Sequence, residues 1–219
     1  MSRVPVLVVE DHPLLAEAIV ALLSREPEFE VLGAWSTVAA ALDAARRQRP
    51  RLVALDQHLP DGKGTDVARA LRGTQPECTV VMLTGDASDA TLVEAIEAGV
   101  SGFISKAVPA WQIVDLLKRA ATGEIVIPAA DLARVLTARS DSARAGMQTR
   151  RVARALTPRD RVVLDLLARG RDTREIAERT GLAVSTIRGH VQTLIEKLGT
   201  HSRLEAVVRA QSLGLVRPL

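Results

Sequence analysis

The sequence lacks any long apolar run, and it is nearly without cysteine. No stretch of its 219 residues approaches the roughly 18 consecutive apolar residues that a membrane-spanning helix requires. The chain also begins without the basic stretch and cleavable apolar segment of a secretory signal. Its single cysteine, Cys78, excludes a disulfide within the chain. We therefore expect a soluble, cytoplasmic protein that does not enter the membrane.

Charge is unevenly distributed along the chain, although its net value is only +3. Residues 1–125 carry 12 Lys and Arg against 17 Asp and Glu, whereas residues 126–219 carry 17 against 9. An acidic half joined to a basic half indicates two tasks, of which the second involves a polyanion. An arginine-rich composition without functional meaning is the alternative, and charge alone does not decide between them.

Five short apolar runs alternate with helical patterns in the first half of the chain. Four of the runs are almost continuously apolar, as strands covered on both faces should be. This alternation predicts an α/β fold, a doubly wound parallel sheet of five strands in the order 2-1-3-4-5. The expected strands are 4–9, 31–35, 52–55, 79–83 and 102–105, and the expected helices are 14–23, 37–48, 64–72, 88–98 and 110–121.

The chain changes character after this alternating region. Residues 123–138 predict a short extended piece and one helix, and residues 138–155 lack an apolar period and are rich in Arg, Ser, Ala and Gly, as linkers are. The last segment, 156–213, has helical patterns throughout. We therefore expect a first domain at 1–122, a linker with a short helix at 123–155, and an all-α four-helix domain at 156–219.

Polar residues stand at the ends of the expected strands. Glu10 and Asp11 end the first strand and Asp56 ends the third. Thr84 ends the fourth, and Lys106 follows the fifth. The carboxyl ends of parallel strands lie along one edge, and a crevice opens between strands 1 and 3, where the winding reverses. Polar residues are common at strand ends, but these five types in this order favour a functional site.

These side chains suit the transfer of a phosphoryl group. Carboxylates placed close together repel unless a cation lies among them, and hard oxygen ligands favour Mg²⁺. A metal held by Glu10 and Asp11 would shield a phosphoryl group that approaches Asp56, the nucleophile. Thr84 can donate a hydrogen bond to one phosphoryl oxygen, and Lys106 can neutralise another.

The motifs VVEDHPLL, LDQHLPDGKG, MLTGD and GFISKA resemble the acid pair, phosphoacceptor, switch threonine and lysine of a response-regulator receiver domain. The resemblance covers about residues 3–122 and implies a flavodoxin-like receiver in which a sensor histidine kinase phosphorylates Asp56. It also implies that Asp56 and Asp11 bind Mg²⁺ directly, Glu10 through water, and His58 through its main-chain carbonyl.

Phe103 occupies the switch aromatic position of this resemblance. Because it has no hydroxyl, Phe103 can signal only by burying its ring when the domain is phosphorylated. Simple packing in the core is the alternative role.

The basic half predicts a helix-turn-helix. Thr157 and Pro158 suit the N-cap and the first position of one helix. A second helix at about 173–179 is joined by a glycine turn to a third at about 186–198, for which Ser185 is the expected cap.

The third of these helices has one apolar side and one polar side. A recognition helix lays such a polar side in the major groove, where Arg188 can read guanine and Gln192 can read adenine. An ordinary amphipathic helix with a solvated face is the alternative. The residues expected to contact bases or phosphates of DNA are Ser185, Thr186, Arg188, Gly189, His190, Gln192, Thr193 and Lys197.

The segments LTPRDRVVLDLLARG and TREIAERTGLAVSTIRGHVQTLIEKLGTHSRLEAV resemble the LuxR-type DNA-binding domain over about 155–213. A receiver joined to this domain is the NarL/FixJ architecture of two-component response regulators. The resemblance implies a phosphorylation-dependent transcriptional regulator that binds double-stranded promoter DNA, as a homodimer when phosphorylated or DNA-bound. Gly189 departs from the expected pattern, because it supplies no side chain for reading a base.

Two other classes of function fit the residues less well. An aspartyl-phosphate phosphatase would carry an acid two residues after the nucleophile, where this chain has His58. A flavin or dinucleotide protein would have a Gly-rich loop after the first strand, where this chain has EDHPLL. We therefore expect no enzyme. An interaction module whose basic half binds RNA or protein stays open at this point.

Overall fold

The first part of the protein is a five-stranded parallel sheet in the order β2-β1-β3-β6-β7. The structure, a computed structural model, describes residues 3–85, 88–140 and 155–216. The doubly wound order predicted from the sequence is confirmed. The strands are β1 (Val4–Val9), β2 (Phe29–Trp35), β3 (Leu52–Asp56), β6 (Thr79–Thr84) and β7 (Gly102–Ser105).

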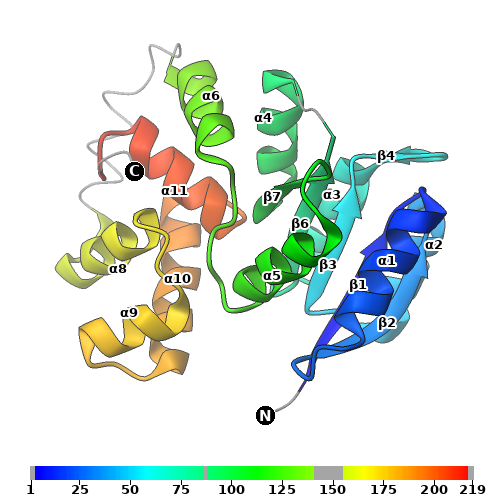
Figure 1. The fold of residues 1–219 in the computed structure, drawn as a ribbon. Helices are drawn as coiled ribbons and strands as arrows, with labels where there is room; N and C mark the ends of the chain where they lie inside the picture. The colour runs from blue at the N-terminus through cyan, green and yellow to red at the C-terminus, as the bar shows by residue number, and fades with distance from the viewer. Residues whose placement is uncertain (1–2, 86–87, 141–154, 217–219) are drawn as a thin grey trace.

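Helices cover both faces of this sheet (Figure 1). One face packs under α2 (Val38–Gln48), α3 (Gly64–Thr74) and α4 (Asp89–Ala98), and the other under α1 (Pro13–Leu23) and α5 (Ala110–Ala121). Each central strand contributes to both cores, because successive side chains of a strand point to opposite faces. This burial on both faces explains the continuously apolar runs of the sequence.

The segment after β3 forms a small antiparallel hairpin, which is not among the strands expected from the sequence. Its strands are β4 (His58–Leu59) and β5 (Gly62–Lys63). Asp61 in the turn accepts hydrogen bonds from the backbone nitrogens of Val38 at 2.6 Å and Ala39 at 3.0 Å. These nitrogens belong to the first turn of α2, so the hairpin beside the expected phosphoacceptor is anchored to that helix.

Within residues 155–216, four helices surround a separate apolar core, as the sequence analysis predicts. They are α8 (Pro158–Ala168), α9 (Thr173–Thr180), α10 (Val184–Leu198) and α11 (Arg203–Ser212). Gly181 follows α9 with a φ of 67°, the left-handed conformation that suits glycine, and it makes the turn into α10.

The start of α10 differs from the prediction. The N-cap of α10 is Ala183, and no side chain caps the helix there, so the expectation that Ser185 is the cap is wrong. Val184 packs against the core of the four helices. The burial of Val184 therefore extends the helix towards its N-terminus, and Ser185 lies exposed in its first turn.

Helix α11 belongs to two cores at once. Its Leu204 and Val208 pack in the core on the α2–α4 side of the sheet, whereas its Ala206 and Val207 pack in the core of the four helices. Another helix, α6 (Ala129–Ser140), contacts both α4 and α11. In Figure 1, α6 and α11 accordingly lie between α4 and the remaining C-terminal helices.

Two polar contacts fix the start of α11 to the first part of the chain. Ser202 Oγ donates to the carbonyl of Val100 at 3.1 Å, and Arg203 donates to the carbonyl of Gly123 at 2.8 Å. Gly123 has a φ of 92°, and a Cβ there would lie 1.7 Å from the Arg203 guanidinium. Glycine at this position therefore permits the close approach of the arginine.

Asp160 connects α8 with α10. Its carboxylate accepts hydrogen bonds from the Thr157 backbone nitrogen at 2.9 Å and from Lys197 Nζ at 2.7 Å, and His190 Nδ1 lies 3.6 Å away. Burial alone would raise the pKa of Asp160, but the bonds from Lys197 and Thr157 outweigh it and lower the pKa to about 2. The side chain of Asp160 also completes the capping box at the start of α8. The orientation of α10 thus depends on the acid that caps α8.

Replacing this acid should reduce stability in a pH-dependent way. We expect Asp160→Asn to destabilise the C-terminal helices by about 2 kcal/mol at neutral pH, because the folded-state pKa is depressed from 3.8 to about 2. A depressed pKa stabilises the fold above the unfolded value, and this contribution is lost as the pH falls from about 4 to about 2. Urea unfolding measured across this window should show a flatter profile for Asp160→Asn than for wild type.

Asp165→Asn is the control for this measurement, since Asp165 forms its one ion pair within the described residues with Arg169, along the partly exposed side of α8. If Asp160→Asn and Asp165→Asn had the same acid profile, the role assigned to Asp160 would be contradicted.

Candidate functional site

Four of the five predicted strand-end residues meet at the carboxyl edge of the sheet. One carboxylate oxygen from each of Glu10, Asp11 and Asp56 lies within a cluster 4.8 Å across, which also includes a ring nitrogen of His12. Lys106 Nζ lies 2.9 Å from Glu10 Oε1 and 2.7 Å from Asp56 Oδ2. Adjacent strands β1 and β3 bring the acids together, and the residue after β7 supplies the ammonium.

Burial and charge oppose each other within this cluster. The residues Glu10 and Asp56 are 2% and 3% exposed. Burial raises the pKa of Asp56 and the charge of Glu10 adds to this, while Lys106 opposes the rise. Burial alone would lower the pKa of Lys106, but its bonds to Asp56 and Glu10 outweigh that effect and raise it. Lys106 therefore stays charged at neutral pH and compensates the acids.

Thr84 ends the strand next to Asp56. Strand β6 pairs with β3, and Asp56 lies opposite Leu83, the residue before Thr84. The carbonyl of Thr84 accepts a hydrogen bond from the backbone nitrogen of Lys106 at 2.7 Å. The edge of the sheet is thus continuous from Asp56 through Thr84 to Lys106.

Phe103 lies in the core on the α2–α4 side of the sheet, where it is 1% exposed. A phenyl ring has no polar atom that favours the surface, so it packs in the apolar core. This position fits both roles that the sequence leaves open for Phe103, a buried switch aromatic and an ordinary residue of the core.

The acid cluster fits Mg²⁺. Glu10 Oε2 is buried and has no hydrogen-bond partner among the described residues, an arrangement that is costly unless a cation or water completes it. The carboxylates of Glu10, Asp11 and Asp56 are the hard oxygen ligands that Mg²⁺ prefers. The backbone nitrogen of His58 lies 3.3 Å from Asp56 Oδ1, so the main chain of His58 passes beside the cluster.

Gly64 shapes this site, although no motif in the sequence predicts a role for it. Its nitrogen donates to the carbonyl of Gln57 at 2.9 Å, and a Cβ at Gly64 would lie 2.1 Å from the carbonyl oxygen of Asp56. The chain after Asp56 therefore folds back so tightly that only glycine fits. The GKG sequence at residues 62–64 gives a turn signal there, but it does not reveal this contact.

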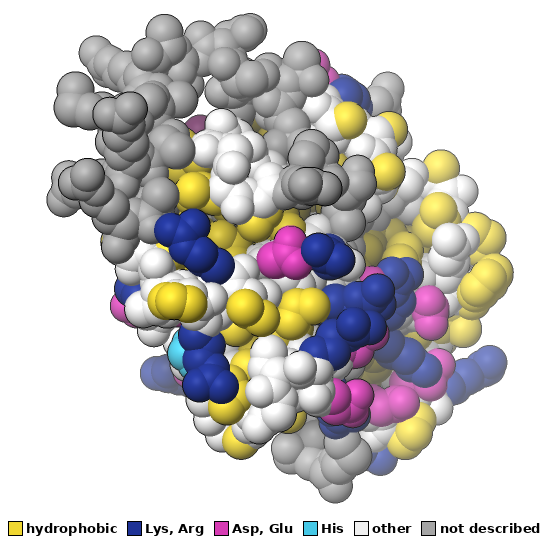
Figure 2. All heavy atoms as spheres, turned by 90° about the vertical axis from the view of Figure 1, so that its left-hand side faces the viewer, with side chains coloured by type: hydrophobic (Ala, Val, Ile, Leu, Met, Phe, Trp, Pro, Cys, Tyr) yellow, Lys and Arg dark blue, Asp and Glu magenta, His cyan; other side chains and the backbone are white. Residues whose placement is uncertain are grey.

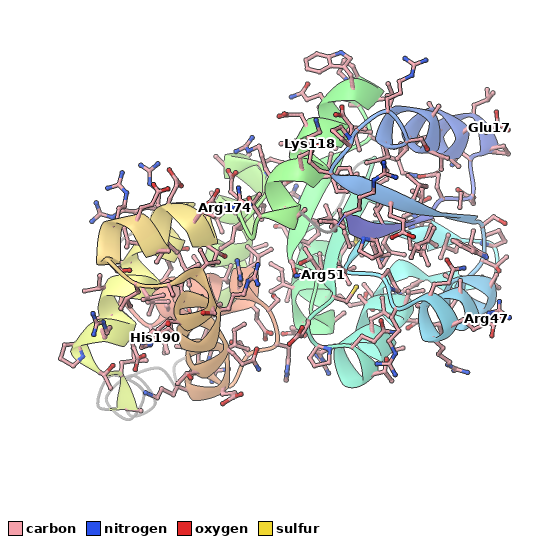
Figure 3. All side chains as sticks on the ribbon, turned by 90° about the horizontal axis from the view of Figure 1, so that it is seen from below. Glu17, Arg47, Arg51, Lys118, Arg174 and His190 are labelled. Atoms are coloured by element: carbon pink, nitrogen blue, oxygen red, sulfur yellow. The ribbon has the colours of Figure 1, made fainter. Side chains whose placement is uncertain are left out.

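The expected reading side of α10 faces the first part of the chain. Arg188, Gly189 and Gln192 line a cavity of about 650 Å³, and Arg51 and Glu77 line its opposite side. Arg51 lies at the edge of the sheet domain that is turned towards the C-terminal helices (Figure 3). Arg188 and Gln192 are themselves exposed to solvent, and they face the sheet domain across this cavity.

The remaining residues expected to contact DNA fall into two groups. Ser185 and Thr186 are exposed at the start of α10, and Thr193 is half-buried. His190 and Lys197 are turned towards Asp160, the acid that caps α8. The ammonium of Lys197 is therefore already paired within the C-terminal helices.

Positive charge is not confined to the reading side. Figure 2 shows the face of the molecule that lies on the left in Figure 1, where the C-terminal helices are. Lys and Arg side chains are spread over this face, with Asp and Glu side chains among them. Overall charge therefore identifies the basic half of the chain, but it does not single out α10.

Two family models match the chain. Residues 6–118 match the response regulator receiver domain, and residues 154–210 match the bacterial regulatory proteins of the luxR family.

Relatives match both parts together. The DNA-binding transcriptional activator DevR/DosR of Mycobacterium tuberculosis is 32% identical over 215 residues, which cover 98% of this chain and 97% of that protein. The nitrate/nitrite response regulator protein NarL of Escherichia coli is 31% identical over 203 residues, 93% of each protein. A solved structure of two RcsB dimers bound to two parallel DNAs shares the fold, with a TM-score of 0.53 and 19% identity over 97% of this chain and 100% of that chain.

The tight turn at Gly64 gives a testable expectation for stability. We expect Gly64→Ala to destabilise the sheet domain by about 1–3 kcal/mol, because the new Cβ must displace the backbone of Asp56. Gly73→Ala, on the same helix but with nothing within 4 Å of its added Cβ, should stabilise it by about 0.5–1 kcal/mol. Urea denaturation of both variants measures the difference, and equal midpoints would rule out the tight packing described for Gly64.

Proposed function

The chain belongs to the NarL/FixJ family of two-component response regulators, which join a receiver domain to a LuxR-type DNA-binding domain, and we propose that phosphorylation of Asp56 switches it. The observation that carries this proposal is the ion cluster. Asp56 is buried beside a second acid, and the ammonium of Lys106 lies 2.7 Å from Asp56 Oδ2, where it balances the charge of the carboxylate. The histidine kinase that acts on it is the proposed phosphoryl donor.

The transfer forms an acyl phosphate on Asp56. A carboxylate oxygen of Asp56 attacks the phosphorus of the kinase phosphohistidine, the P–N bond breaks, and the imidazole leaves with the bonding electron pair. Lys106 then neutralises a phosphoryl oxygen, and the Thr84 hydroxyl donates a hydrogen bond to another.

Mg²⁺ would be held by the carboxylates of Glu10, Asp11 and Asp56 and by the main-chain carbonyl of His58. The ion, when bound, supplies positive charge between these acids and the incoming phosphoryl group. The lone oxygen of Glu10, which has no hydrogen-bond partner among the described residues, supports this assignment.

We assign the receiver to residues 1–122, the linker to 123–155 and the DNA-binding domain to 156–219. Helix α6 lies in this linker, and residues 141–154 fall outside the part of the chain that the structure describes. None of the described helices is long and apolar enough to cross a membrane. We propose a cytoplasmic location, where the kinase and promoter DNA are both accessible.

In the DNA-binding domain, α10 is the proposed recognition helix. Arg188 and Gln192 are assigned to guanine and adenine, and Ser185 and Thr186, exposed at the start of the helix, are assigned to the backbone or nearby bases. Lys197 instead anchors α10 through the acid that caps α8, so its contribution to DNA binding is indirect.

The closed arrangement supports masking as the form of control. Arg188 and Gln192 cannot enter a major groove while they face the receiver across the cavity. Helix α4 follows the strand that ends in Thr84, and α4 contacts both α6 and α11. Movement of Thr84 towards a phosphoryl group would therefore loosen the contacts that hold the DNA-binding domain against the receiver.

The released domain is proposed to bind DNA as a homodimer. Two DNA-binding domains related by a two-fold axis match paired half-sites, and the paired contacts multiply affinity. RcsB, which shares the fold, forms dimers on DNA. Phosphorylation would thus release the domain from its receiver and make it available to a second copy.

Phosphorylation is tested by intact-mass measurement with acetyl phosphate and Mg²⁺. We expect wild type and Asp115→Asn, which alters an exposed acid on α5, to gain one phosphoryl group, and we expect Asp56→Asn to gain none. Oligomeric state and DNA binding are read on the same samples. The scheme fails if Asp56→Asn without a phosphoryl donor dimerises and binds promoter DNA as well as phosphorylated wild type does.

Masking is tested by breaking the contact between α11 and the receiver. Arg203→Ala removes the hydrogen bond to Gly123, a contact of about 1.5–3 kcal/mol, so the unphosphorylated variant should bind promoter DNA about tenfold more tightly. Arg209→Ala, on the same helix, is the control for the loss of charge. Small-angle scattering should show the domains of Arg203→Ala further apart. Unchanged DNA affinity in Arg203→Ala would count against masking.

A further inference from the structure

The cavity between the two domains is lined by arginines from both of them. Arg51 and Arg72 come from the receiver, and Arg188 and Arg203 come from the DNA-binding domain. The cavity has a volume of about 650 Å³. DNA recognition would explain Arg188, and Arg72 also donates to the carbonyl of Glu97 within the receiver. Neither contact explains why Arg51 faces the same space.

These positive charges are not balanced inside the cavity. Two acids, Glu77 and Glu124, are among the described lining residues. Glu124 accepts a hydrogen bond from Arg119, which is not part of the lining, at 2.8 Å, so its charge is already compensated. Within the described part of the chain, neither Arg51 nor Arg188 forms an ion pair. The lining is therefore strongly cationic.

Arg203 is half-buried, whereas Arg51 and Arg188 are exposed. The Arg203 guanidinium donates to two neutral acceptors, the carbonyl of Gly123 at 2.8 Å and Thr173 Oγ1 at 3.0 Å. Burial lowers the pKa of Arg203, and the charge of Arg188 lowers it further, with Asp172 opposing. A buried cation beside a second cation gains stability when an anion lies between them.

We propose that this cavity binds a small phosphate-bearing anion, which holds the receiver and the DNA-binding domain together. Its volume falls in the range of about 300–1,000 Å³ typical of ligand sites. Guanidinium groups bind phosphate oxygens through paired hydrogen bonds. The described lining has no Phe, Tyr or Trp on which a base could stack, which favours a sugar phosphate or an inorganic polyphosphate over a nucleotide.

Such a ligand would act on the switch by mass action. The site is complete only when both domains contribute their arginines, so a ligand bound there stabilises the closed arrangement. It would also occupy Arg188, the side chain assigned to DNA. By linkage, phosphorylation that opens the domains must weaken anion binding by the same factor as the anion opposes opening. This consequence for DNA rests on the proposed function, whereas the binding itself does not.

Calorimetric titration of the full-length, unphosphorylated protein with inorganic pyrophosphate tests the site. The titration uses EDTA and constant ionic strength, so that neither metal binding nor screening contributes. Arg51→Gln is the informative variant, because the Arg51 side chain is exposed to the cavity and forms no ion pair within the described residues. Losing one charged hydrogen-bond donor should weaken binding about tenfold.

Arg47→Gln is the matched control. Arg47 lies on α2, on the side of the receiver away from the DNA-binding domain, and pairs with Asp43 (Figure 3). It makes the same change of charge outside the cavity, so its affinity for pyrophosphate should equal that of wild type. Absence of binding, or equal affinity in wild type and Arg51→Gln, or equal weakening in both variants, overturns the proposal.

Closure is read separately from spin labels on Glu17→Cys and Arg174→Cys, in a Cys78→Ser background. These positions lie on opposite sides of the molecule, on α1 and α9 (Figure 3). Pyrophosphate should increase the population with the domains close together. An unchanged distance distribution would overturn the proposal that the anion holds the two domains together. Asp56 labelling by acetyl phosphate is measured in parallel. If Asp56 is not labelled while pyrophosphate still binds, the proposed function is wrong and the proposed anion site is unaffected.

Discussion

The ammonium of Lys106 lies between the carboxylates of Glu10 and Asp56, and the acid cluster depends on it. Two buried carboxylates without a cation would repel, and one of them would take up a proton. Burial raises the pKa of Asp56, and the hydrogen bond from Lys106 opposes that rise, which favours the ionised nucleophile. The three groups stand at the ends of β1 and β3 and just after β7, so the cluster forms only if the parallel sheet brings these ends to one edge.

The position of α11 makes domain closure a matter of apolar burial as well as hydrogen bonding. Leu204 and Val208 pack in the receiver core, so opening the protein exposes both side chains unless a new surface covers them. Full exposure of one such side chain costs about 1.5–3 kcal/mol. Helix α4, which contacts α11, follows the strand that ends in Thr84. The free energy of closure is therefore accessible to changes at the proposed phosphorylation site.

The sequence predicts the sheet and its ion cluster because the spacing of apolar residues and the polar residues at strand ends are both visible in short stretches of the chain. Parallel strand ends must share an edge, so the positions of Glu10, Asp56 and Lys106 follow from the order of elements. The contacts of Gly64 and Ser202 do not follow, because their partners are backbone oxygens that every residue presents. Ser202, the N-cap of α11, meets a carbonyl 102 residues away along the chain. For Phe103, residue type alone does not decide between a buried switch aromatic and an ordinary residue of the core.

Under the proposed function, masking and DNA reading compete for one side of α10. Arg188 and Gln192 face the receiver in the closed protein, so the affinity for DNA falls in proportion to the fraction of molecules that are open. A hundredfold reduction requires the closed arrangement to be favoured by about 3 kcal/mol. Two apolar side chains and two hydrogen bonds from the start of α11 are sufficient for this. Coupling between distant sites amounts to about 1–3 kcal/mol. A closed state of this free energy would be stable enough to silence α10, as proposed, and weak enough for one phosphoryl group to reverse.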